Sequence, residues 1–327
     1  MFKRMFHIKE ISSYKLQQRP AYCKYIENFS SIIASTYQLE NSYDRSGSFI
    51  FFDKQLNKTK EIKTEAGIFR FDVDKFKVNS ILASLTNGKL GLVNVENDRI
   101  IYSDKLSDGM LLNQCQNWEN SNNIIITTDN LGTVFIVDGD KEYNIIESKV
   151  VHLLSFNKLP CEVWSCGFIK LNDGNIFGTG GDDGILKIWD KRQGLNKYVD
   201  NFETVDNSGI TFISHSLYKD NEYIVGSYDE VLRIFDIRNM KEPKKSLKLN
   251  GGIWYVEEHI VDNVQQFYCS CMYGGWNLIE NKDNILSLKI NNNDHGEDLL
   301  YGISKVDECS VVNCTFNDYT IRLESIQ

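Results

Sequence analysis

A histidine in a strongly acidic loop is the side chain in this sequence best suited to move a proton. His295 lies in the segment DHGED, which spans residues 294–298. A neighbouring carboxylate would hold and orient the imidazole, so His295 is the first candidate for a general base. The alternative is a solvated loop histidine without a catalytic role.

Glu230 is the second catalytic candidate, because it follows the turn residue Asp229 and has no evident role inside the repeat described below. We expect its carboxylate to orient a water molecule or a cationic substrate. Glu162 and Tyr228 are further candidates for substrate binding, with a rim hydrogen bond as the alternative. The chain lacks a Gly-x-Ser-x-Gly motif, and its five histidines allow no assignable Ser-His-Asp triad.

Metal and nucleotide chemistry are not predicted. The eight cysteines include no pair of Cys-x-x-Cys motifs, and buried free thiols in a reducing cytosol are the expected state. The glycines of residues 178–184 resemble a phosphate-binding loop, but a strand follows them and no lysine stands where a phosphate would need it. We therefore expect neither a cofactor nor a metal ion.

Two similar stretches near the middle of the chain indicate the fold. Residues 178–190 (GTGGDDGILKIWD) and 226–236 (GSYDEVLRIFD) each suggest a strand, a polar turn, a second strand and a closing aspartate. Weaker copies recur at intervals of 42–52 residues, which is typical of a β-propeller. The units end near residues 53, 96, 138, 190, 236, 280 and 325. The sequence therefore predicts an all-β, seven-bladed WD-repeat propeller that occupies residues 1–327.

The two ends of the chain suggest how the ring closes. Only two residues follow the last unit, so its outer strand is missing, and residues 1–14 have no other partner. We expect this N-terminal segment to supply that strand, because an open sheet edge invites aggregation. The longest interval predicts an inserted loop around residues 141–157. The turn residues Asp183, Asp229 and Asp318 are expected to make hydrogen bonds within their blades.

Charge and hydropathy exclude several classes of partner. The net charge is −9 and the lysines are scattered, which argues against a nucleic-acid-binding protein. No apolar run approaches the ~20 residues that a membrane-spanning helix needs. The first ten residues lack the apolar core of a signal peptide. We expect a cytoplasmic monomer that meets a protein partner.

Several phrases go beyond a generic WD repeat. They are EVW (162–164), GDDG (181–184), GSYDE (226–230), DIRNMKEP (236–243), GGIW (251–254), CM (271–272), His295 ahead of LYG (300–302), and CTFND (314–318). From about residue 162 onward, the chain resembles the eukaryotic WD-repeat diphthine methyl ester hydrolases (diphthine methyltransferase or methylesterase family) of diphthamide biosynthesis. The SYDE and DIRNMK phrases followed by Gly-Gly-x-Trp are the specific part of the resemblance.

The resemblance implies hydrolysis of the methyl ester of methylated diphthine on translation elongation factor 2, which permits the final amidation to diphthamide. This substrate carries a trimethylammonium group beside the ester. Such a cation binds best against aromatic faces, so Trp164, Trp254 and Tyr228 are the candidate cage, with core packing as the alternative. The other function classes are a non-catalytic WD-repeat docking scaffold and a trafficking adaptor.

Overall fold

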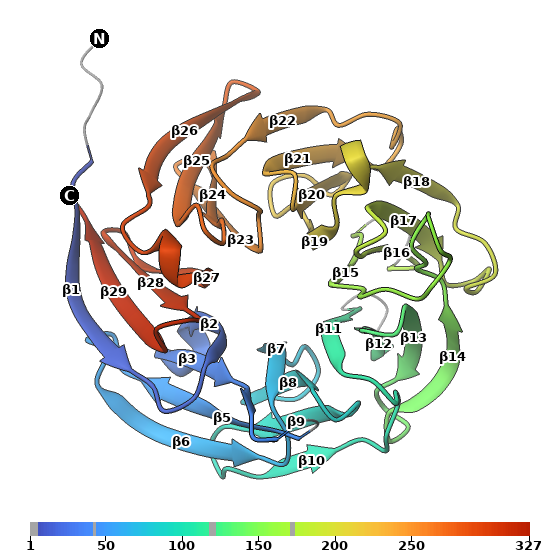
Figure 1. The fold of residues 1–327 in the computed structure, drawn as a ribbon, viewed down its shortest axis with the longest axis horizontal. Coiled ribbons are helices and arrows are strands. Elements are labelled where there is room, and N and C mark those ends of the chain that lie inside the picture. Colours follow the sequence, from blue (N-terminus) through green and yellow to red (C-terminus); the bar gives the residue numbers. More distant parts are fainter. Residues whose placement is uncertain (1–5, 42–43, 118–121, 171–173) are drawn as a thin grey trace.

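Seven antiparallel sheets follow one another around a closed ring in the computed structural model (Figure 1). The structure describes residues 6–41, 44–117, 122–170 and 174–327. Within these ranges there is no α-helix, and the only helical turns are the short 3-10 segments η1 (Glu27–Phe29), η2 (Val205–Asn207) and η3 (Gly296–Asp298). The predicted all-β seven-bladed propeller is confirmed.

Each blade places its first strand on the central channel and its fourth on the circumference. The first strands are β2 (Pro20–Ile26), β7 (Ile68–Val73), β11 (Leu111–Gln116), β15 (Ser165–Phe168), β19 (Ile210–His215), β23 (Tyr255–Val261) and β27 (Leu300–Asp307). The second strands are β3 (Ser31–Thr36), β8 (Ser80–Leu85), β12 (Ile124–Asp129), β16 (Ile176–Gly180), β20 (Glu222–Ser227), β24 (Val264–Ser270) and β28 (Ser310–Thr315).

The third strands correspond to the repeat recognised in the sequence. They are β5 (Arg45–Phe52), β9 (Leu90–Asn94), β13 (Thr133–Asp138), β17 (Ile185–Asp190), β21 (Val231–Asp236), β25 (Trp276–Lys282) and β29 (Thr320–Ile326). The outer strands are β6 (Lys58–Thr64), β10 (Ile100–Tyr102), β14 (Asn144–Val150), β18 (Asp200–Glu203), β22 (Lys245–Lys248), β26 (Ile285–Asn292) and β1 (Ile8–Lys15). A short strand, β4 (Gln38–Leu39), extends the sheet of the first blade beside β5.

The N-terminal strand closes the ring. β1 pairs antiparallel with β29, from Ile8 opposite Ile326 to Lys15 opposite Thr320. His7 and Gln327 exchange two backbone hydrogen bonds of 2.9 Å just beyond the strands. The last blade thus has a fourth strand from the other end of the chain, as predicted, and its edge is covered. Residues 1–5 of the predicted closing segment lie outside the described residues.

The predicted insertion at residues 141–157 is wrong in its boundaries. Most of this stretch is the regular outer strand β14, which pairs with β13 along its whole length. The extra length follows it, in the connection of residues 151–164 that leads to β15. Within this connection Leu153 and Pro160 form an isolated bridge.

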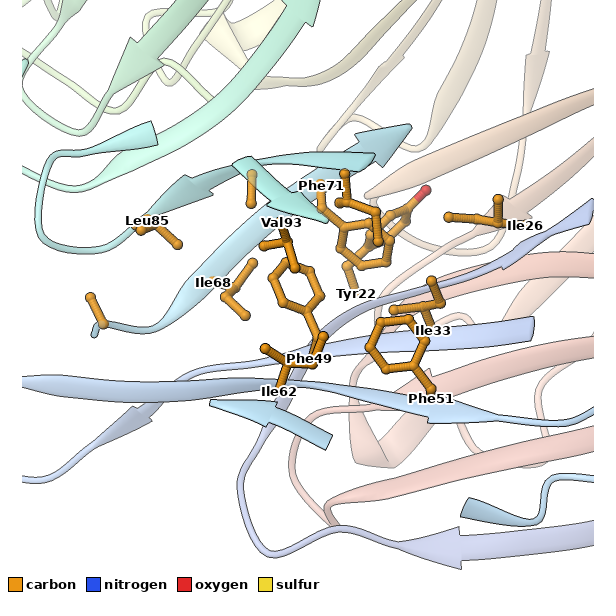
Figure 2. Close-up of a cluster of buried hydrophobic side chains, with 13 residues drawn as sticks. Tyr22, Ile26, Ile33, Phe49, Phe51, Ile62, Ile68, Phe71, Leu85 and Val93 are labelled. Carbon is orange, nitrogen blue, oxygen red and sulfur yellow. The ribbon is translucent and has the colours of Figure 1, made fainter. Parts of the chain in front are cut away.

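Apolar side chains between adjacent blades hold the ring together. Between the first two blades, the Phe71 ring packs edge-on against Phe49, with ring centroids 5.4 Å apart, and against Tyr22 at 5.1 Å (Figure 2). Ile33 and Ile68 complete this cluster and are fully buried. Each blade presents apolar side chains on both faces of its sheet. Burial of both faces against the neighbouring blades therefore stabilises the closed ring.

Two rims are distinguished by their connections. On the crossover rim, outer strands cross to the next inner strand and second strands turn into third strands. The crossover segments and the second-to-third strand turns are hydrogen-bonded to each other on this rim. The Asp182 amide donates to the Glu162 carbonyl, and the Ile253 amide donates to the Ser227 carbonyl. The hairpin rim, opposite, carries the turns between first and second strands and between third and outer strands.

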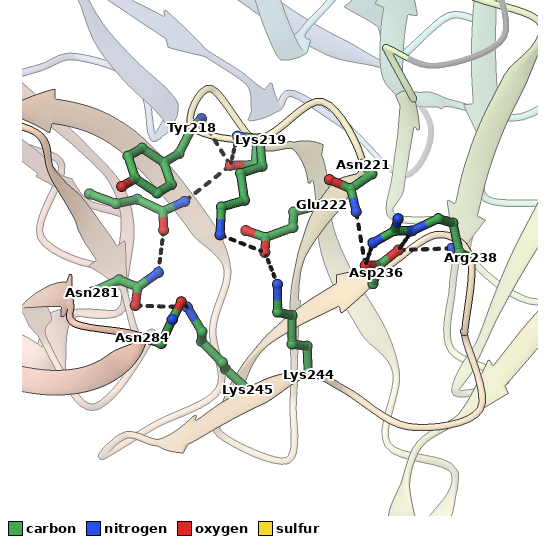
Figure 3. Close-up of polar contacts among 12 residues, drawn as sticks. Tyr218, Lys219, Asn221, Glu222, Asp236, Arg238, Lys244, Lys245, Asn281 and Asn284 are labelled. Atoms are coloured by element: carbon green, nitrogen blue, oxygen red, sulfur yellow. Dashed lines mark hydrogen bonds and ion pairs between the residues drawn. The ribbon is translucent and has the colours of Figure 1, made fainter.

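The family-like phrase at residues 236–243 lies on the hairpin rim and has a structural role. Arg238 forms an ion pair with Asp236 at 2.6 Å, and Asn221 donates to the same carboxylate (Figure 3). Met240 is fully buried. Nearby, the buried Glu222 carboxylate accepts from Lys244 at 2.7 Å (Figure 3).

One histidine that the sequence analysis did not single out fixes the turn of the fourth blade. His152 Nδ1 lies 2.9 Å from the Asp183 carboxylate, and its Nε2 lies 2.8 Å from the Thr179 hydroxyl, which also accepts from Trp189. In the fifth and seventh blades, Arg233 and Arg322 instead reach the turn aspartates. The predicted structural role of Asp183, Asp229 and Asp318 is confirmed.

Candidate functional site

Seven aromatic side chains gather on the crossover rim, and we call them the aromatic crown: Tyr37, Phe69, Trp164, Tyr228, Trp254, Tyr301 and Phe316. Phe69 belongs to the second blade, yet its ring lies 6.0 Å from Trp164 and 6.2 Å from Trp254. Trp164 and Trp254 lie just before the first strands of the fourth and sixth blades, and neither of these blades is next to the second. The crown therefore reaches across the axis of the ring and covers one end of the channel.

Trp254 is the centre of the crown. Its ring centroid lies 4.8 Å from that of Tyr301, 5.3 Å from Trp164 and 6.4 Å from Tyr228. Its backbone amide donates to the Ser270 carbonyl, which fixes the approach to β23. Trp254 is only 4% exposed, whereas Trp164 and Tyr228 are partly exposed. Tyr37, Tyr301 and Phe316 are partly exposed as well, so Trp164 and Tyr228 are the accessible rings on the side of the fourth and fifth blades.

A carboxyl group with an unusual environment adjoins this surface. The Trp164 indole N–H donates to Asp182, which lies in the second-to-third strand turn of the fourth blade. Burial raises the pKa of Asp182 to about 6; the Trp164 hydrogen bond opposes this rise, and the Glu162 carboxylate adds to it. Asp182 thus changes its charge close to neutral pH, as acid–base catalysts do.

Small residues make room for this arrangement. A Cβ atom at Gly209 would lie 2.7 Å from an Asp182 carboxylate oxygen and 2.9 Å from the Tyr228 ring. At Gly252 it would meet the Met272 sulfur at 3.1 Å and the Tyr228 ring at 3.3 Å. Glycines at both positions allow the fourth, fifth and sixth blades to bring these side chains together.

Tyr228 keeps its proton at neutral pH. Burial raises its pKa well above the usual value, and the nearby carboxylate of Asp182 adds to this effect. A protonated phenol can donate a hydrogen bond to a developing oxyanion. Aromatic faces, two acids and a neutral donor are therefore combined at one place on the rim.

The structure places His295 away from the crown. Its Nε2 lies 3.7 Å from Glu324 on β29 and 3.8 Å from Glu10 on the closing strand β1. Glu324 also accepts hydrogen bonds from Trp276 and Asn292. The acidic neighbours of His295 therefore come from the last blade, and its general-base role stays a prediction.

Glu230 ends the corresponding turn of the fifth blade and lies near Lys248 at 3.5 Å. Its φ of 70° is in the left-handed region, and the equivalent turns carry Gly88, Gly132, Gly184 and Gly275 with φ between 70° and 84°. A non-glycine residue there is strained, and such strain concentrates at functional sites. No hydrogen bond or ion pair among the described residues joins Glu230 to His295.

Four of the predicted substrate residues are thus brought together: Glu162, Trp164, Tyr228 and Trp254. Sequence reasoning missed Asp182 as a functional candidate. The signal was the doubled aspartate in the GDDG turn, because Asp183 alone makes the turn contacts. Nothing in the sequence showed that the second acid would face Trp164.

Other sites offer less chemistry. Among the described residues, no group of three or more His, Cys, Asp or Glu side chains could hold a metal ion. All eight cysteines are free; six are buried, Cys115 is partly exposed and Cys309 is exposed. Burial raises the pKa of the Cys161 thiol to about 12, so it is not a thiolate at neutral pH. Within the described chain, no helix has the length and apolar character needed to cross a membrane.

Comparison with known proteins gives relatives named diphthine methyltransferase and other WD-repeat proteins. No family model matches the chain. It is 29% identical over 229 residues to the "Diphthine methyltransferase homolog" of Dictyostelium discoideum, which covers 64% of this chain and 61% of that protein. It is 26% identical over 156 residues to human "Diphthine methyltransferase", covering 47% of this chain and 32% of the human protein.

Of two further relatives, one carries the same name and the other is named only for its WD repeats. The "Diphthine methyltransferase" of Schizosaccharomyces pombe is 23% identical over 243 residues, which cover 72% of this chain and 71% of that protein. A "WD repeat-containing protein 55" of Danio rerio is 33% identical over 70 residues. The resemblance expected from the sequence is confirmed: this propeller is similar to WD-repeat proteins named diphthine methyltransferase.

Proposed function

We propose that this protein acts in diphthamide biosynthesis and that it hydrolyses the methyl ester of methylated diphthine on elongation factor 2. The names of its relatives support the pathway. Those names specify a methyltransferase, whereas our proposal is a carboxylic ester hydrolase. The observation that carries this choice is the Asp182 carboxyl group, whose pKa is about 6, beside a partly exposed aromatic surface.

The aromatic surface suits the cationic part of the substrate. A trimethylammonium group cannot donate hydrogen bonds and is bound through aromatic faces and nearby negative charge. Trp164 and Tyr228 offer the faces, with Trp254 packed behind them. Glu162 and Asp182 add the negative charge at the same place. The substrate would lie with its ammonium group on the crown and its ester toward the two acids.

In the proposed reaction, the Asp182 carboxylate takes a proton from a water molecule as that water attacks the ester carbonyl. The Tyr228 hydroxyl donates a hydrogen bond to the oxyanion that forms. The bond between the carbonyl carbon and the methoxy oxygen then breaks, and the proton passes to methoxide. The products are a free carboxylate, methanol and one proton released to solvent.

His295 and Glu230 keep their predicted roles as alternatives within the same reaction. Both belong to the crossover rim, so a large protein substrate covering that rim would contact them. Glu230, with its strained backbone, would orient water or the cationic group; His295 would serve as the base if the ester lay over the last blade.

The test is to incubate the purified protein with methyl-esterified elongation factor 2 and to measure methanol and substrate mass. We expect methanol release with loss of one methylene unit from the substrate. Asp182→Asn should lower the rate by ~10²-fold or more, the usual contribution of a general base. His295→Ala and Glu230→Gln, assayed beside it, assign the base: full activity in Asp182→Asn with loss in His295→Ala would transfer that role.

A docking function is the second candidate, and one surface favours it. The connection after β14 exposes Phe156 at 80% and Leu159 at 58%, and Ile146 on β14 is 57% exposed. Exposed apolar groups of this kind are typical of protein interaction sites. A scaffold would keep its partners when Asp182 is changed, and wild-type protein would then release no methanol. A cytoplasmic, monomeric protein remains our prediction.

A further inference from the structure

The central channel contains a cavity of about 360 Å³ that the proposed hydrolysis does not use. Its walls come from the first strands of six blades, β2, β7, β11, β15, β19 and β23. It extends to Lys75 and Leu217, which lie in the turns between first and second strands. The cavity therefore runs along the channel from Arg70, next to the aromatic crown, to the hairpin rim at the other end of the ring.

Arg70 on β7 lines this cavity and is the least expected residue in it. Its side chain is 6% exposed, and no carboxylate among the described residues lies within ion-pair distance. Its guanidinium lies over the rings of Tyr22, Trp254 and Tyr255 at 5.0–5.6 Å. The Nη2 group donates to the Trp254 carbonyl at 3.1 Å, but the buried Nη1 group has no hydrogen-bond partner.

The acids of the cavity wall are engaged elsewhere. Asp72 forms an ion pair with Lys24 at 2.8 Å. Glu257 accepts from the Ser304 hydroxyl and the Lys305 amide at 2.7 and 2.6 Å. Glu258 accepts from the Leu217 amide and from the side chains of Ser216 and Gln265. The positive charge of Arg70 is therefore left without a matching acid.

A buried charge without a counter-ion is unfavourable in a folded protein and calls for a compensating partner. The aromatic faces around Arg70 supply part of this compensation, but they leave the two N–H donors of Nη1 without an acceptor. Lys75 adds a second positive charge at the cavity wall. Burial and the charge of Lys75 lower the pKa of His215 to about 4, so this wall residue is neutral at pH 7.

We propose that this cavity binds a small carboxylate ligand, with its carboxylate on Arg70 and its remainder between β11 and β23. Guanidinium and carboxylate match in shape and charge. The volume suits a metabolite or the last residues of a peptide rather than a folded partner. Because Nη1 is covered from water, binding includes a small shift of the guanidinium over the tyrosine rings. The Arg70–Trp254 hydrogen bond places this site directly beneath the crown.

The experiment measures thermal unfolding of the full chain with sodium acetate, succinate and citrate at constant ionic strength, with chloride as the reference. At about one hundred times the dissociation constant, a carboxylate should raise the melting temperature of a chain of this length by roughly 4 °C. Arg70→Met should weaken binding at least about tenfold, the loss expected for a charge-assisted hydrogen bond. The control is Arg99→Gln, because Arg99 is an exposed arginine just before β10. This variant should bind the carboxylates as wild type does.

The ligand-free variant gives a second readout. Replacing an unpaired buried charge by an apolar side chain should leave the melting temperature of Arg70→Met unchanged or higher. If Arg70→Met melts at a much lower temperature or does not fold, Arg70 also has a structural role, and the binding test passes to Lys75. Lys75→Gln changes an exposed position and should weaken carboxylate binding several-fold without affecting folding, so the proposal stays testable if Arg70→Met does not fold.

Two further arms identify the source of the carboxylate. A short peptide with a free C-terminus is compared with the same peptide carrying a C-terminal amide. If the free-acid peptide binds more tightly than acetate and succinate, the ligand is a chain terminus. If acetate or succinate binds more tightly than this peptide, the ligand is a metabolite. Inorganic phosphate that stabilises more than every carboxylate overturns the assignment. So does an equal response of wild type and Arg70→Met to all anions.

Discussion

Two adjacent aspartates in one turn are predicted to respond in opposite ways to the same substitution. Asp182 faces Trp164 and Glu162, with a pKa of about 6. Asp183 contacts His152 and Lys187 at 2.8–3.0 Å and is fully buried at its side chain. Changing each to asparagine keeps size and shape and removes only the charge. We expect Asp182→Asn to stabilise the protein at neutral pH and Asp183→Asn to destabilise it.

The magnitude for Asp182 follows from its pKa. A rise from the ordinary 3.8 to about 6 corresponds to about 3 kcal/mol of disfavoured ionisation. Because the group is partly exposed, solvent screening reduces this to about 1–2 kcal/mol. A raised carboxyl pKa destabilises the folded state above the unfolded pKa, and the full effect is present above pH 6. The gain in Asp182→Asn should therefore be complete at pH 7–8 and absent below pH 4.

The sign for Asp183 is the reverse. Burial alone would raise its pKa, but the His152 hydrogen bond and the charge of Lys187 outweigh it and hold the pKa of Asp183 below 3.8. A depressed carboxyl pKa stabilises the folded state above the unfolded value, and this contribution is lost as the pH falls. Removing one partner of a buried pair costs about 3–5 kcal/mol. Asp183→Asn should show this loss at neutral pH.

The assay is thermal and urea unfolding of wild type, Asp182→Asn and Asp183→Asn between pH 4 and pH 8. The reasoning is refuted if Asp182→Asn is less stable than wild type at pH 7.5, or if its difference from wild type is the same at pH 4 and pH 8. Equal behaviour of the two variants would show that the environments described for the neighbouring carboxyl groups are not those of the protein in solution.

Three further predictions concern closure, strain and binding. Deleting residues 1–14 removes β1 and should lower the melting temperature sharply and promote association; an unchanged, monomeric protein would disprove the closure. Glu230→Gly relieves a left-handed backbone and should stabilise by about 1 kcal/mol, which urea unfolding measures; destabilisation would contradict the strain argument. In hydrolysis kinetics, Tyr228→Phe removes the hydroxyl donor and should lower kcat by ~10²-fold with little change in KM. Tyr228→Leu also removes the aromatic face and should in addition raise KM by roughly 3–30-fold. Equal kinetics of the two variants would argue against the aromatic cage.

Most of the fold could be predicted because the propeller repeats its own signal. The third strands are buried on both faces, so they stand out as apolar runs closed by a polar residue. The outer strands carry no such signal. β14 exposes Ile145 and Ile146 to solvent, and its irregular pattern led to the wrong insertion at residues 141–157.

A candidate site residue could be predicted from the sequence only where its residue type alone suggests a binding or catalytic role. Trp164, Tyr228 and Trp254 could be proposed from the sequence because they stand at blade starts and turns, and the structure adds four further aromatic residues beside them; their role in binding stays a prediction. Asp182 was missed because its pKa depends on burial and on Glu162, which three-dimensional packing creates. His152 was missed because its partner Asp183 lies 31 residues further along the chain. Arg70 gave no signal, since being unpaired is a property of its surroundings.

The central claim is that the aromatic crown and Asp182 form an ester-hydrolysing site. The most direct test measures methanol from methyl-esterified elongation factor 2 with wild-type protein and with Asp182→Asn, both shown to be folded. The account predicts methanol release by wild type that rises as the pH increases through about 6, and at least ~10²-fold less release by Asp182→Asn. Wild-type protein that binds the substrate and releases no methanol, or an Asp182→Asn variant with full activity, would contradict it.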